Sequence, residues 1–135
     1  MMKKLLFSLL CAMVPTVTVA QDTVVGEVLF AQHCATCHGL DARGNGPMAP
    51  VLMLQPSDLT QLTNLAAGTF PISLLIAKLD GRDPLLSHGS PMPVFGPFFE
   101  GKGVVMRGEE GLLIMTSQPI IDLVEYLESI QVQPQ

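Results

Sequence analysis

The stretch that most constrains this chain is a Cys-x-x-Cys-His motif, which residues 34–38 form as Cys-Ala-Thr-Cys-His. Two thiols at this spacing can each add across one haem vinyl group and form a thioether. The histidine that follows then supplies an axial nitrogen to the iron. The motif therefore predicts one covalently bound haem c, attached through Cys34 and Cys37, with His38 as a metal ligand. The sequence contains no second motif of this kind, so we expect a single haem.

Two other kinds of site use paired cysteines, namely a thioredoxin-like redox couple and half of a zinc site. The redox couple is typical of a βαβ context, and residues 24–60 show no such pattern. Structural zinc takes four Cys or His ligands, and after residue 21 only His88 remains beyond the cluster of His33, Cys34, Cys37 and His38. The pattern favours haem over both alternatives.

The first twenty residues have the pattern of a cleaved export signal. Lys3 and Lys4 precede an apolar run over residues 5–14, which is too short to span a bilayer. Small residues then lead to a cleavage point ahead of Gln21. We expect residues 1–20 to be removed and residues 21–135 to form one domain without a membrane span. Retention of the segment as a membrane anchor is the alternative.

The part of the chain after the signal is acidic. The whole chain has seven Lys and Arg, two of which lie in the signal, against twelve Asp and Glu. This balance disfavours nucleic acid and anionic lipid as partners, and it favours redox proteins with a basic docking patch. Plain solubility is the competing explanation of the charge.

Three stretches predict helices, over residues 23–33, 71–80 and 120–130. Each places apolar residues at helical spacing. The sequence offers capping residues before the first helix (Asp22 or Thr23) and before the last (Ser117 or Gln118), and Pro71 in the first turn of the middle one. Residues 39–58 are rich in Gly and Pro and predict a long loop.

These features together resemble the class I c-type cytochromes, small monohaem proteins of bacteria. Gly26 and Phe30 resemble the family's first helix and residues 122–127 its last, which implies that Tyr126 packs near Gly26 and Phe30. The resemblance implies an all-α, cytochrome c-like fold with three or more helices around one covalently bound haem. It also implies a periplasmic location, because bacteria attach such haems outside the cytoplasmic membrane.

The resemblance implies the other ligand and a positioning group as well. Met92 lies in Gly-Ser-Pro-Met-Pro-Val-Phe-Gly, which resembles the family's MPxF loop, so Met92 is the expected second metal ligand. In the family a proline carbonyl accepts a hydrogen bond from the axial histidine. That role falls to Pro47, in Gly-Asn-Gly-Pro, unless these residues form only an ordinary Gly-Pro turn. Residues 56–60, Pro-Ser-Asp-Leu-Thr, resemble the family's PxDLT stretch and predict entry into a short helix.

Other side chains compete for the iron. His88 is the rival sixth ligand and would give a bis-histidine haem of lower potential. His33 is expected to be structural or exposed, since it precedes Cys34 and points away from the haem. Four further methionines are expected to fill the core: Met48, Met53, Met106 and Met115.

Between the MPxF loop and the last helix, residues 96–119 form a longer segment than the smallest class I cytochromes have at this position. Their alternating pattern predicts a small β-hairpin insertion at about 103–115. Three roles remain open for such an insertion: it covers a haem edge, it forms a docking surface for a partner, or it is a surface loop without a function.

The expected function is single-electron transfer with both axial ligands retained, so the chain is not expected to be an enzyme. Two alternatives remain at this point. One is a cytochrome subunit of a larger oxidoreductase complex, and the other is a haem sensor or enzyme with a labile sixth ligand.

Overall fold

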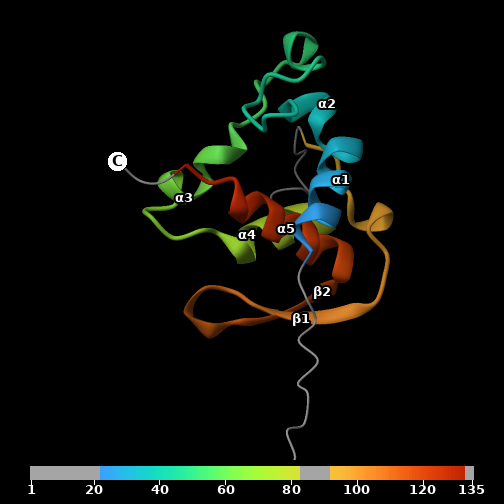
Figure 1. Ribbon diagram of the computed structural model, residues 1–135, viewed down its shortest axis with the longest axis vertical. Coiled ribbons are helices and arrows are strands. Elements are labelled where there is room, and N and C mark those ends of the chain that lie inside the picture. The colour runs from blue at the N-terminus through green and yellow to red at the C-terminus, as the bar shows by residue number, and fades with distance from the viewer. Residues whose placement is uncertain (1–21, 83–91, 133–135) are drawn as a thin grey trace, which may run out of the picture.

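The computed structural model describes residues 22–82 and 92–132. These residues form five α-helices and one two-stranded sheet (Figure 1). The helices are α1 (Thr23–His33), α2 (Ala35–His38), α3 (Leu62–Leu65), α4 (Ile72–Asp80) and α5 (Gln118–Ser129). The predicted export signal and His88 lie outside the described residues. None of the described helices is both long enough and apolar enough to cross a membrane.

Helix α1 begins and ends where the sequence predicts. A side-chain oxygen of Asp22 accepts hydrogen bonds from the amides of Val24 (3.0 Å) and Val25 (3.3 Å), which caps the first turn. At the other end the amide of Cys34 donates to the carbonyl of Phe30 at 2.8 Å, and α2 starts at the next residue. The haem motif therefore continues directly from a capped helix.

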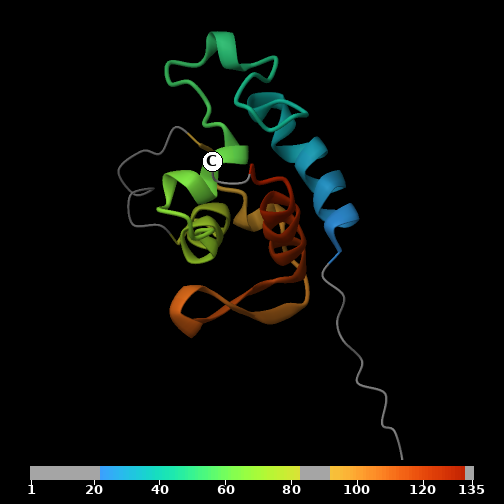
Figure 2. The same ribbon diagram turned by 60° about the vertical axis from the view of Figure 1, so that its left-hand side comes forward.

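Helices α1 and α5 cross closely, as the resemblance implies (Figure 2). A Cβ atom built on Gly26 would lie 2.0 Å from the carbonyl oxygen of Asp122, so only glycine allows this approach. One turn further along, the rings of Phe30 and Tyr126 lie 5.4 Å apart. The predicted contact of Tyr126 with Gly26 and Phe30 is confirmed.

The core lies where α1, α4 and α5 meet. Its largest fully buried side chains come from these three helices and from the segment before the sheet: Phe30, Ile76, Phe99, Leu123 and Val124. Cys34 and Ala35 belong to the same buried cluster. The attachment motif is thus part of the core at one end of the molecule.

The predicted hairpin is present, and its second strand runs two residues past the predicted end. Strand β1 (Gly103–Arg107) pairs antiparallel with β2 (Leu113–Ser117), and Ser117 leads straight into α5. Met106 is buried on the inner face, whereas Leu113 and Met115 are exposed on the outer face. Figures 1 and 2 place the hairpin at the opposite end of the molecule from α2.

The turn of the hairpin is fastened to α4 by Glu109. Its carboxylate accepts hydrogen bonds from the amide of Ser73 (3.1 Å to Oε2) and from the Ser73 hydroxyl. Ser73 lies in the first turn of α4, where amides have no partner within the helix. Burial of Glu109 opposes its charged form, but the bonds from Ser73 and from backbone amides outweigh it, so the pKa of Glu109 lies below its ordinary value.

Glu109→Gln is expected to lower the free energy of unfolding by about 0.5–1 kcal/mol at neutral pH, because a neutral amide interacts less favourably with the start of α4. A carboxylate whose pKa is lowered by folding stabilises above its ordinary pKa and loses this effect as pH falls through the lowered value. Urea unfolding should therefore show the difference at neutral pH and lose it as the pH falls through the lowered pKa of Glu109. Glu110→Gln, an exposed neighbour, is the control, and a difference that persists unchanged in acid would contradict the role of the Glu109 charge.

Candidate haem-binding site

The two cysteines of the motif lie at either end of the first turn of α2. Cys34 is the buried residue that joins α1 to α2, and Cys37 is half-buried. The thiols form no disulfide. Burial, together with the nearby Cys37, raises the pKa of the Cys34 thiol to about 12, so this thiol stays protonated at neutral pH.

The zinc alternative lacks support in this geometry. Within residues 22–82 and 92–132, no three His, Cys, Asp or Glu side chains come together in a way that could hold a metal ion. The motif alone offers two thiols and one imidazole, which is short of the four ligands that structural zinc takes.

The imidazole of His38 is held by a backbone carbonyl. Its Nδ1 lies 2.9 Å from the carbonyl oxygen of Ser57. Since a carbonyl oxygen only accepts, Nδ1 is the donor in this bond, and in the neutral tautomer that makes this bond, Nε2 has the lone pair for a metal. A bond of this kind fixes the ring orientation and makes the imidazole a more basic ligand.

The acceptor predicted for His38 was the carbonyl of Pro47, and the structure corrects this to Ser57. Pro47 lies in a loop that leaves the motif, is exposed, and is followed by a short 3-10 turn, η1 (Ala49–Val51). The chain returns to the ring only at Ser57, just before the η2 turn (Leu59–Gln61). The PxDLT stretch was the available signal, because its second residue supplies the carbonyl.

This loop is tied to the motif along its first part. The amides of Gly44, Gly46 and Met48 donate to the carbonyls of His38 (2.7 Å), Cys37 (3.0 Å) and Thr36 (3.0 Å). These are carbonyls near the end of α2, which have no partner within so short a helix. The first part of the loop, residues 44–48, therefore packs directly against the attachment residues.

Met92 comes from a different part of the chain. It is half-buried and packs against the core cluster. The chain after it is anchored on α4, where the amide of Phe95 donates to the carbonyl of Leu79 at 3.2 Å. The Phe95 ring lies 6.4 Å from the ring of His33, the residue before Cys34. Through this contact the segment that carries Met92 is joined to the start of the motif.

His33 is structural, as predicted. Its ring also packs edge-on against Phe99 at 5.2 Å and contacts Phe98. The sequence does not by itself predict this aromatic cluster, although it has three Phe residues within five positions.

The other methionines do not all fill the core as expected. Met106 is buried, but Met48, Met53 and Met115 are exposed. Two of the exposed ones lie on the loop after the motif, and Met115 lies on the outer face of the hairpin. These three apolar side chains are exposed because the loop and the outer face of the strand, on which they lie, face solvent.

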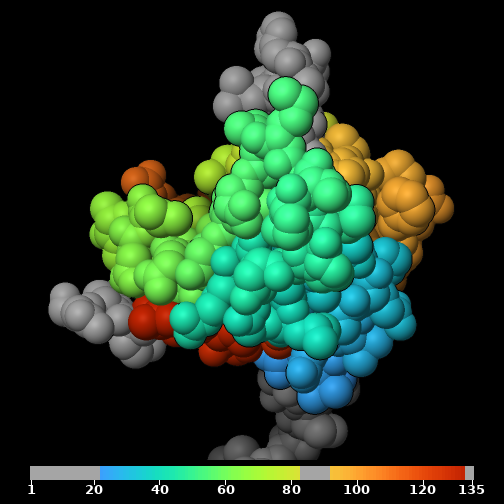
Figure 3. Space-filling model, turned by 90° about the horizontal axis from the view of Figure 1, so that it is seen from above, coloured from blue at the N-terminus to red at the C-terminus, as the bar shows by residue number. Residues whose placement is uncertain are grey.

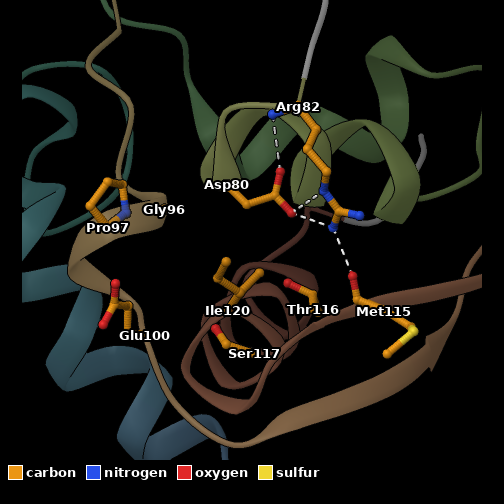
Figure 4. A pocket seen from close by; sticks show the side chains of 9 residues that line it. All are labelled: Asp80, Arg82, Gly96, Pro97, Glu100, Met115, Thr116, Ser117 and Ile120. Atoms are coloured by element: carbon orange, nitrogen blue, oxygen red, sulfur yellow. Dashed lines mark hydrogen bonds and ion pairs between the residues drawn. The ribbon is translucent and has the colours of Figure 1, made fainter.

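A pocket of about 460 Å³ lies away from the motif, between the end of α4, the η4 turn (Gly96–Phe98) and β2 (Figure 4). Arg82 crosses its rim, with Nε 2.6 Å from a carboxylate oxygen of Asp80 and Nη2 2.8 Å from the carbonyl oxygen of Met115. These bonds tie α4 to the hairpin. The described residues that line this pocket include neither Met92 nor any residue of α2.

Comparison with known proteins supports the interpretation of the motif. The sequence model of the cytochrome c family matches residues 24–131, which include the attachment motif, Met92, the hairpin and α5. Searches of curated proteins and of solved structures found no match. The family match supports a haem-based electron-transfer function. This chain belongs to the cytochrome c family.

Proposed function

We propose that the protein is a periplasmic, monohaem carrier of single electrons, with haem c attached through Cys34 and Cys37 and with His38 and Met92 as axial ligands. The observation that carries the proposal is the geometry of His38. Its Nδ1 donates a hydrogen bond to the Ser57 carbonyl, so Nε2 is the ring nitrogen left to bind iron. The two thiols beside it form no disulfide and are free to react with haem.

The donor set fits this group. Two thiols two residues apart suit two thioether bonds, and one imidazole follows them directly. Cys34 belongs to the buried apolar cluster, which suits a macrocycle that needs an apolar enclosure. When bound, the haem would supply a reversible one-electron couple, and the chain supplies attachment, ligands and exclusion of water.

Met92 is the proposed second ligand because its surroundings hold its backbone. Pro93 follows it directly, and the amide of Phe95 is bonded to α4. Gly96 fits closely against α4, since a Cβ atom there would lie 2.6 Å from the Asp80 carbonyl oxygen. A thioether on a restrained segment is suited to permanent ligation, and methionine ligation raises the potential of the haem.

The experiment that tests this proposal is the intact mass and optical spectrum of the exported protein. We expect a chain that begins at Gln21 and is heavier than its sequence by one haem. The haem should stay with the protein during acidic organic extraction, because thioethers survive a treatment that removes coordinated haem. An unmodified mass, or haem that is lost on extraction, would contradict covalent attachment, and a mass that includes residues 1–20 would contradict cleavage.

A further inference from the structure

The loop that leaves the attachment motif exposes an unusual amount of apolar surface. Residues 48–54, here called the apolar loop, place five large apolar side chains in solvent: Met48, Val51, Leu52, Met53 and Leu54. Single exposed apolar residues are ordinary, but a contiguous set of this kind marks an interaction site. Figure 3 looks down on this end of the molecule, where the loop appears in green in front of the rest.

The apolar loop is held against the attachment residues at both ends. On its outgoing side the amides of Gly46 and Met48 bond to the carbonyls of Cys37 and Thr36, each at 3.0 Å. Gly46 fits so closely that a Cβ atom on it would lie 2.5 Å from the Thr36 oxygen. On its return side Ser57 accepts the bond from His38. A molecule that contacts the loop therefore lies close to the residues proposed to hold the haem.

The loop and its flanks carry no charge, although the chain has a net charge of −5. Residues 44–57 include no Asp, Glu, Lys or Arg. Just before them, a nitrogen of Arg43 and a carboxylate oxygen of Asp41 lie 3.9 Å apart, so these two charges offset each other. Just after them, Asp58 is half-buried, and its carboxylate accepts hydrogen bonds from the amide and hydroxyl of Thr60. An uncharged apolar surface is matched by a partner surface of the same character, because a charged partner surface would lose water there without gaining an ion pair.

A lipid surface fits this loop less well than a protein does. Loops and helices that bind anionic membranes pair their apolar residues with Lys or Arg, which meet the phosphates. Residues 44–57 offer neither, and the net charge of the chain is repelled by an anionic bilayer.

We propose that the apolar loop is the docking surface for a redox protein whose own docking patch is uncharged and apolar. This inference rests on the proposed function. In the docked complex one electron passes between the haem and the cofactor of the partner, which serves as oxidant or reductant, and no bond or proton is exchanged. This partner differs from the redox protein with a basic docking patch that the acidic composition favours. Because the apolar loop carries no charge, the association of a partner with it should depend little on ionic strength.

The chain offers a matched pair of variants for the test. Met53→Ser/Leu54→Ser removes two exposed apolar side chains from the loop, where Leu54 is 61% exposed. Leu113→Ser/Met115→Ser removes the same two residue types from the outer face of β2, where Leu113 is 62% exposed. The hairpin lies at the opposite end of the molecule (Figure 1), so the control removes similar apolar surface far from the motif.

The probe is a gold electrode with a methyl-terminated alkanethiol monolayer, which presents an uncharged apolar surface, and an amine-terminated monolayer presents a basic one. On the methyl surface we expect haem voltammetry from the wild type and the hairpin variant. The loop variant should lose about tenfold or more of its interfacial electron-transfer rate there. It should keep its signal on the amine surface, and its solution spectrum and potential should be unchanged.

Several results would overturn the proposal. The loop variant could keep its rate on the methyl surface, or the hairpin variant could lose as much. A changed spectrum or potential in the loop variant would mean that the loop packs on the haem. Loop-dependent sedimentation with phosphatidylcholine–phosphatidylglycerol vesicles would assign the loop to a membrane. A wild type without a haem signal on either surface would instead refute the proposed function, and the docking site with it.

Discussion

Gly26→Val is expected to lower the free energy of unfolding by about 3 kcal/mol. A Cβ atom at this position would lie 2.0 Å from the Asp122 oxygen and 2.7 Å from the Cβ of Tyr126. The first of these neighbours is backbone, which cannot rotate away, so α1 and α5 must separate. That separation also loosens the packing between Phe30 and Tyr126. Denaturant unfolding of the haem-loaded protein, followed by circular dichroism, measures the loss.

Gly103→Val is the matched control for this prediction. Gly103 begins β1, and a Cβ atom there would meet no heavy atom within 4 Å. Valine also suits an extended backbone, so this variant should unfold within about 0.5 kcal/mol of the wild type. Equal stability of the two variants would show that the helix crossing tolerates a side chain and would contradict the packing argument.

Local signals explain why much of the helical frame was predictable from the sequence. The Asp22 cap defines the start of α1, and Gly81, with φ of 84°, ends α4 at the predicted position. Helix α5 begins two residues earlier than predicted, at Gln118, because Pro119 occupies its first turn. The hairpin was also predictable, since strands over 103–107 and 113–117 alternate between inner and outer faces.

The orientation of His38 was not predictable in the same way. The Gly-Asn-Gly-Pro sequence pointed to Pro47 as the hydrogen-bond acceptor of the His38 ring. The acceptor depends instead on which carbonyl, further along the chain, the loop brings back to the ring, and this is the carbonyl of Ser57. The deciding feature is the loop between them, whose path follows from its bonds to α2 rather than from residue preferences. The exposure of Met53 on this loop has the same origin, because composition predicts an apolar residue to be buried unless a fold holds it outside.

Met92→Ala is expected to lower the reduction potential by on the order of 0.1 V or more, because loss of a thioether ligand removes stabilisation of the ferrous state. The ferric protein should lose the weak far-red band of a methionine-ligated haem. Its ferrous form should bind carbon monoxide, which an intact six-coordinate iron resists. Potentiometric titration and optical spectra, with and without carbon monoxide, measure these three effects on one sample.

Met115→Ala is the control for the ligand, because Met115 stands exposed on the hairpin at the end of the molecule away from α2. This variant should keep the reduction potential and the far-red band of the wild type, and its ferrous form should not bind carbon monoxide. If Met92→Ala kept them too, Met92 would not be the ligand, and His88→Ala would be the next variant to examine. If the wild type bound carbon monoxide readily, the sixth position would be labile. A pure electron carrier holds both of its ligands through each redox cycle, so that result would favour a sensor or enzyme instead.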